Sequence, residues 1–165
     1  MALAGVLAAL KPRVVAWAEA VAEPNDGDEC DAEALPAALE TLYEAARAAL
    51  SARAADALAA AIVGEVAARA ERRMLAQRYS RAAALAVERR ARRVARWAGG
   101  GGCGGGAARE RCARLTQAAA LLALERVAHA PDALHPAPRL PPSRAKEILA
   151  RRIDFKIEEI KRLKL

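Results

Sequence analysis

The chain has 165 residues, of which 55% are hydrophobic and 28% charged, and it carries a formal net charge of +7. The apolar fraction excludes a disordered tail, and no apolar run approaches the roughly 18 residues that a membrane span needs. About 47 residues are alanine, the best helix former, whereas aromatic residues make up 3%. This composition argues against an all-β fold and predicts a single all-α domain.

The first half of the chain predicts a series of helices. Residues 2–22 form an amphipathic segment in which Pro12 predicts a kink or two short helices. After an acidic turn, residues 31–50 predict a second helix. Residues 56–98 contain no proline, so one or two long helices follow there. Residues 99–106 read GGGGCGGG, which is typical of a linker.

The second half continues with one further helix and then becomes ambiguous. Residues 107–130 predict a helix, and the proline-rich residues 131–142 predict an extended linker. Residues 143–165 form the C-terminal segment, in which the stripe that includes Ile153, Ile157 and Ile160 favours a helix. Alternation within 148–160 also fits a strand. We therefore expect a bundle domain over 1–130 with about five helices, a linker, and a C-terminal segment that favours helix.

The long segment before the glycine-rich linker has two faces. At helical spacing, one face carries apolar residues and the other carries arginines. The apolar face contains Tyr79, Ala83, Val87, Val94 and Trp97, and the opposite face contains Arg78, Arg81, Arg89, Arg92 and Arg96. This division predicts that one side is buried and the other is a cationic ridge.

The charge distribution leaves two interpretations of that ridge open. Residues 69–96 contain ten arginines and two acids, a local charge of +8, whereas residues 19–33 contain seven acids and no base. Arginine suits phosphate because its planar fork donates two parallel hydrogen bonds, so the five arginines could follow a nucleic-acid backbone. Alternatively, the ridge is a solvated face or contacts acidic protein, including the chain's own acidic loop. No aromatic residue is interleaved among the arginines, which argues against stacking of single strands.

The sequence indicates no catalytic, cofactor or metal site. The three serines have no neighbours typical of a catalytic triad, and His129 and His135 lie too far apart for a tight zinc motif. The glycine-rich run lacks the Lys and Ser or Thr of a phosphate-binding loop. Three cysteines without C-x-x-C spacing indicate reduced intracellular thiols. We therefore expect a protein that is not an enzyme and binds no cofactor.

The segment from Arg69 to Arg81 resembles a helix of the GINS replication proteins, closest to the subunit usually numbered one. The family pattern of two basic positions, an apolar pair, Ala and a later Arg is filled by Arg69, Arg72, Met74, Leu75, Ala76 and Arg81. An acidic turn containing Asn, a helix ending in Leu-Tyr-Glu, a basic run ending at a tryptophan and a later Pro-Pro pair fall in similar places. Arg73 and Gln77 depart from the family. The family also places a β-rich domain after the Pro-Pro pair, where 23 residues follow here.

The resemblance implies an all-α, non-catalytic subunit that assembles with three related subunits and supports the replicative DNA helicase. We expect a hetero-oligomer, intracellular and nuclear, with no membrane association; a mitochondrial location is the lesser alternative. The residues expected to pack against partner chains are Leu39, Leu42, Tyr43, Tyr79, Val87, Val94, Trp97, Ile153, Ile157 and Ile160. Two alternatives stay open: a basic nucleic-acid-binding module of a ribonucleoprotein, and a viral or organellar helical interaction protein.

Overall fold

The helices account for nearly all of the regular structure. The structure, a computed structural model, describes residues 3–25, 30–99, 106–135 and 137–165. Within these ranges the helices are α1 (Leu3–Val21), α2 (Cys30–Ala48), α3 (Ala52–Ala76), α4 (Arg81–Gly99), α5 (Gly106–Ala123), α6 (Ala130–Leu134), α7 (Pro142–Leu149) and α8 (Ile157–Arg162). A short 3-10 turn occupies Val127–His129. The all-α prediction is confirmed, and none of the described helices is long and apolar enough to cross a bilayer.

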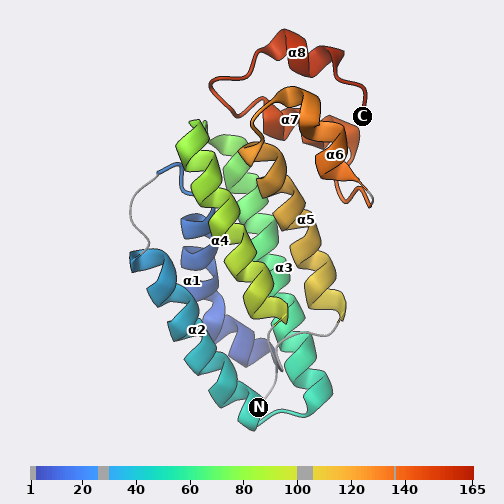
Figure 1. Ribbon diagram of the computed structural model, residues 1–165. Helices are drawn as coiled ribbons and strands as arrows, with labels where there is room; N and C mark the ends of the chain where they lie inside the picture. The colour runs from blue at the N-terminus through green and yellow to red at the C-terminus, as the bar shows by residue number, and fades with distance from the viewer. Residues whose placement is uncertain (1–2, 26–29, 100–105, 136) are drawn as a thin grey trace.

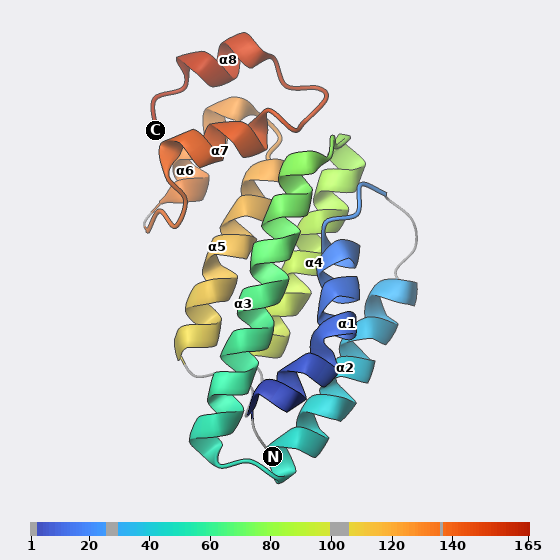
Figure 2. The same ribbon diagram turned by 180° about the vertical axis from the view of Figure 1, so that it is seen from behind.

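The five long helices run alternately up and down beside one another, and α6 to α8 lie across the end of the bundle where α5 finishes (Figures 1 and 2). Serine hydroxyls cap the N-termini of two of the helices. Ser51 accepts a hydrogen bond from the amide of Ala54 at the start of α3, and Ser80 accepts one from Ala83 at the start of α4. Because such caps satisfy amides that lack a partner in the first turn, they define where α3 and α4 begin.

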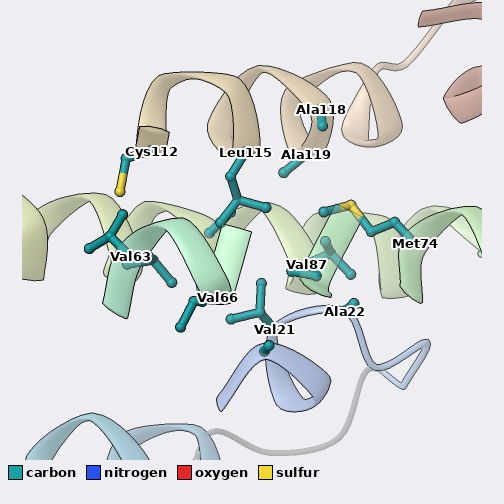
Figure 3. Packing of buried hydrophobic residues seen from close by; sticks show 14 of the residues in the cluster. Val21, Ala22, Val63, Val66, Met74, Val87, Cys112, Leu115, Ala118 and Ala119 are labelled. Atoms are coloured by element: carbon teal, nitrogen blue, oxygen red, sulfur yellow. The ribbon is translucent and has the colours of Figure 1, made fainter. Parts of the chain in front are cut away.

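Alanine is the commonest residue in the interior of the bundle. In Figure 3, Val66 of α3, Val87 of α4 and Leu115 of α5 enter the same space, with Val21 of α1 below them. Many of the remaining buried positions on these helices are alanines, including Ala119, which is fully buried. Small side chains allow the helix axes to approach closely, so a core with few large residues still excludes water.

Three aromatic side chains pack against one another between helices of the bundle. The ring of Trp97 meets the ring of Trp17 at 5.6 Å and that of Tyr43 at 5.4 Å, both in edge-to-face geometry. These contacts join α1, α2 and α4. Edge-to-face pairs are favourable beyond their buried area because the positive ring edge meets the negative ring face.

Proline has less effect on the helices than the sequence predicts. Pro12 lies inside a single helix, α1, whose first part stands at an angle to the rest in Figure 2, so the prediction of a kink holds and that of two helices does not. The prediction of an extended linker over 131–142 is wrong at residues 131–134, which lie in α6. Pro131 stands at the first positions of that helix, where a missing amide proton costs nothing. The glycine-rich residues 100–105, Cys103 among them, and the acidic residues 26–29 lie outside the described residues.

The C-terminal segment is neither the single helix nor the strand that its sequence allows. Helix α7 ends at Leu149, residues 150–156 are irregular, and α8 follows. The irregular residues make one isolated parallel bridge between Arg152 and Tyr79. In this bridge the Tyr79 amide donates to the Arg151 carbonyl at 2.9 Å, and the Ile153 amide donates to the Tyr79 carbonyl at 3.0 Å. A continuous helix over 148–160 would have no free backbone groups to offer Tyr79.

Candidate interaction surfaces

Helix α4 carries a line of outward arginines, which we call the arginine stripe: Arg81, Arg89, Arg92 and Arg96. All four are exposed, as is Arg78 just before the helix, whereas the opposite side of α4 is buried in the bundle. The helix contains six arginines and one acid, Glu88, which gives it a charge of 6 − 1 = +5. The sequence-predicted division between a buried face and a cationic face is therefore present in the fold.

Few acids neutralise the stripe. Arg92 pairs with Glu88 one turn earlier at 2.6 Å, and Arg81 lies 3.4 Å from Glu125 at the end of α5. For Arg89 and Arg96, no ion pair or hydrogen bond occurs within the described residues. The stripe consequently presents at least two uncompensated guanidinium groups to solvent.

The two remaining arginines of α4 turn toward α1 instead. Arg90 and Arg93 line a small hollow with Trp17 and Val21. Arg90 donates to the backbone carbonyl of Glu23 at 2.9 Å and to the carbonyl and side-chain oxygens of Asn25 at 3.1 and 2.7 Å. Burial lowers the pKa of the Arg90 guanidinium, while Glu23 acts in the opposite direction. Arg90 therefore fastens the start of the acidic loop to α4 and does not belong to the open stripe.

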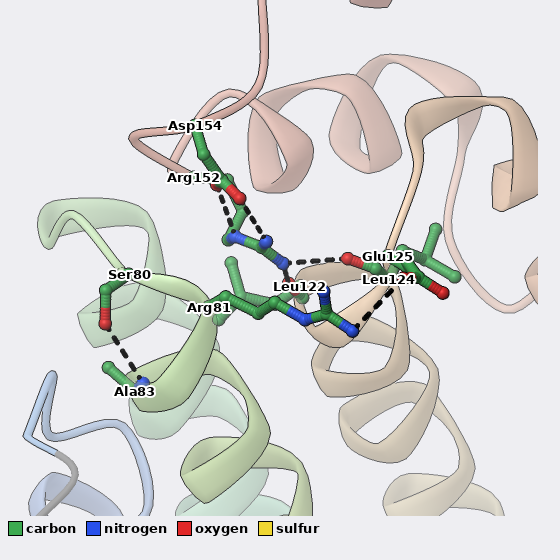
Figure 4. A network of polar contacts seen from close by, with 8 residues as sticks. All are labelled: Ser80, Arg81, Ala83, Leu122, Leu124, Glu125, Arg152 and Asp154. Carbon is green, nitrogen blue, oxygen red and sulfur yellow. Dashed lines mark hydrogen bonds and ion pairs between the residues drawn. The ribbon is translucent and has the colours of Figure 1, made fainter.

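The C-terminal elements are fastened to the bundle by a residue that sequence reasoning missed, Arg152. Its side chain is wholly buried, and it donates to the Leu122 and Leu124 carbonyls at the end of α5, at 2.6 and 2.9 Å (Figure 4). It also makes two hydrogen bonds to the Asp154 carboxylate, at 2.8 and 2.7 Å. These bonds lower the pKa of Asp154. The guanidinium lies 4.4 Å from the ring centre of Phe155, which covers one of its faces.

Most of the residues expected to pack against partner chains are used inside this chain. Six are buried and two are partly buried against the core: Leu39, Tyr43, Tyr79, Val87, Val94 and Ile160 in the first group, Leu42 and Trp97 in the second. Tyr79, for example, donates from its hydroxyl to the Ala22 carbonyl at 2.6 Å. In this fold these eight side chains pack in or against the chain's own core, so they offer little surface to a partner.

The other two expected contact residues are exposed. Ile153 and Ile157 are 61% and 56% exposed, and among the described residues the only other large apolar side chain classed as exposed is Leu85, at 36%. Ile153 belongs to the bridge with Tyr79. Arg152 is buried against the bundle, whereas Ile153, the next residue, is turned toward solvent. Ile153 and Ile157 are thus two exposed isoleucines at the end of the bundle.

The described residues include the free thiol of Cys112 and no candidate metal site. They contain no group of three or more His, Cys, Asp or Glu side chains that could hold a metal ion. Cys112 is a free thiol in the core, and burial raises its pKa to about 11, so the reactive thiolate is scarce near neutral pH. Among the described residues, the arginine stripe and the two isoleucines are exposed groups of distinct chemistry.

Comparison with known proteins gives no match. No protein-family model matches the sequence, and no match was found among curated proteins.

Proposed function

We propose that this protein is a non-catalytic helical subunit of a hetero-oligomeric complex, one that resembles a GINS subunit and supports the replicative DNA helicase in the nucleus. The observation that carries the proposal is the exposure of Ile153 and Ile157. Two large aliphatic side chains within five residues expose apolar surface to water, which is unfavourable. Because each is already about 40% buried, a partner chain that covers them gains roughly 1–2 kcal/mol for each.

The position of the GINS-like segment is consistent with this proposal. Its residues form the end of α3 and the turn into α4, where Met74 is buried and Arg72 is exposed. The same turn carries Tyr79, which pairs with the backbone beside Ile153. The segment that resembles the family and the two exposed isoleucines therefore meet at one end of the bundle.

The test is reconstitution with the three other GINS subunits of the source organism. The full chain is co-expressed with them, and the mass of the purified assembly is measured by light scattering after size exclusion. We expect one copy of each chain, and we expect the double variant Ile153→Asp/Ile157→Asp to be released from the assembly.

A matched control separates this surface from a general effect of added charge. Ala45 of α2 and Ala57 of α3 are exposed, so the variant Ala45→Asp/Ala57→Asp adds the same two charges elsewhere and should stay in the assembly. A wild-type chain that elutes as a monomer in the presence of all three subunits would exclude the proposed role. Equal release of the two variants would exclude the two isoleucines as the contact.

A further inference from the structure

The arginine stripe points to a ligand that the proposed subunit role does not require. We infer that Arg81, Arg89, Arg92 and Arg96 bind the phosphate backbone of double-stranded nucleic acid. The stripe covers fifteen helical steps, which at 1.5 Å each is about 22 Å. Duplex DNA carries a negative charge for roughly every 1.7 Å of its axis, so a line of this length can meet several phosphates in any register.

The choice of residue supports phosphate over a protein carboxylate. All six basic residues of α4 are arginines, and their guanidinium forks can donate two parallel hydrogen bonds to one phosphate. An acidic protein would need carboxylates spaced to match the stripe, whereas a phosphate backbone supplies anions continuously. Glu88, the one acid of the helix, is occupied by Arg92 and is largely buried, so it adds little repulsion.

The surroundings favour a duplex over a single strand. Recognition of single strands relies on exposed aromatic side chains on which bases stack. The one aromatic residue of α4, Trp97, is turned inward against Trp17 and Tyr43. With no ring beside the stripe on α4, the contact is to the backbone and is independent of base sequence.

The experiment measures binding of the full chain to a labelled duplex of about 20 base pairs, longer than the roughly 22 Å stripe, by fluorescence anisotropy at several salt concentrations between about 50 and 200 mM. We expect an affinity that falls linearly on a double-logarithmic plot. The variant Arg89→Gln/Arg92→Gln/Arg96→Gln should bind at least roughly 10-fold more weakly. It should also lose up to about 2.7 from the magnitude of the slope, because each phosphate that an arginine neutralises releases counterions and contributes about 0.9.

Two further variants make the result specific. Arg13, Arg53 and Arg162 are exposed on α1, α3 and α8, so Arg13→Gln/Arg53→Gln/Arg162→Gln removes the same charge from other faces and should bind within about 2-fold of wild type. The variant Arg89→Lys/Arg92→Lys/Arg96→Lys keeps the charge and should retain most of the slope. Circular dichroism of each variant confirms that the helices are intact.

Several outcomes would overturn the inference. One is that the wild-type chain does not bind the duplex at about 50 mM salt. Another is that the stripe variant and its control lose equal affinity for the duplex. A third is that the lysine variant does not bind. Tighter binding of a polyglutamate peptide than of the duplex at the same salt concentration would assign the stripe to an acidic protein and would also overturn it. The experiment uses the chain alone, so it stands or falls separately from the assembly with GINS subunits.

Discussion

Replacement of Arg152 by methionine should detach the C-terminal helices from the bundle. The substitution keeps an unbranched side chain in the buried site but removes donors to the Leu122 and Leu124 carbonyls. A hydrogen bond from a charged donor contributes roughly 1.5–3 kcal/mol, so the two together contribute about 3–6 kcal/mol. Asp154 is 46% exposed and regains water, so its lost pairing adds little. We therefore expect a loss of about 4 kcal/mol, within the range given by the two hydrogen bonds.

The assay is urea unfolding followed by far-ultraviolet circular dichroism. With a slope of about 2 kcal/mol per molar urea, a loss of about 4 kcal/mol lowers the midpoint by about 2 M. Because Arg152 lies between two parts of the fold, faster hydrogen exchange of the Tyr79 and Ile153 amides, which form the bridge, should accompany the shift. Exchange of those amides distinguishes local detachment of the C-terminal helices from uniform destabilisation.

Two comparisons decide whether the reasoning holds. The adjacent Arg151 is half-buried, and its Nε atom has no hydrogen-bond partner among the described residues, so Arg151→Met should cost less than about 1 kcal/mol. Asp154→Asn keeps one acceptor for the guanidinium and should cost about 1–2 kcal/mol. A loss below about 1 kcal/mol in Arg152→Met, or a loss in Asp154→Asn as large as in Arg152→Met, would refute the assignment of the energy to the α5 carbonyls.

Three further predictions concern the acid dependence of stability, a helical glycine and a buried thiol. Arg152 lowers the folded-state pKa of Asp154, so the stabilisation from the pair is complete above the unfolded pKa of about 3.9 and is lost as the pH falls through the lower folded value. The difference in urea midpoint between wild type and Asp154→Asn should therefore shrink below about pH 3.9. A constant difference would contradict this. Gly64→Ala in α3 should raise stability by up to about 1 kcal/mol, because the new methyl group displaces only the exposed, flexible end of Arg111, and a lower melting temperature would show that this side chain cannot move aside. Cys112, in a variant whose other cysteines are serine, should resist a thiol reagent at about pH 8 until urea unfolds the chain, since burial raises its pKa to about 11; rapid modification of the folded protein would contradict its burial.

The helices and the arginine stripe could be inferred from local pattern alone. Spacing of three and four along α4 separates Val87 and Val94 from Arg89 and Arg96, because a helix returns to the same face every 3.6 residues. Arg90 and Arg93 are also arginines of α4, but each lies about 100° around the helix axis from the adjacent stripe residue. Only the packing of α1 shows that these two side chains line the hollow beside Trp17 and Val21.

The role of the C-terminal residues was decided by the tertiary structure. The spacing of Ile153, Ile157 and Ile160 fits one helical stripe, yet Ile160 is buried and the other two are exposed. The physical reason is a competition between local and long-range hydrogen bonds. The Tyr79 backbone and the α5 carbonyls at Leu122 and Leu124 lack helical partners, and the residues around Arg152 satisfy them only by leaving the helix.

The sequence by itself therefore determined the all-α class, the helical repeat and the sign and face of the charge, because these follow from interactions between residues a few positions apart. The tertiary structure decided which apolar residues form the core, which two stay uncovered, and that an arginine is the buried link between the bundle and the C-terminal helices. Those outcomes depend on groups 28 to 73 positions apart in the chain, as between Arg152 and Leu124 or Tyr79. No local periodicity encodes separations of that size.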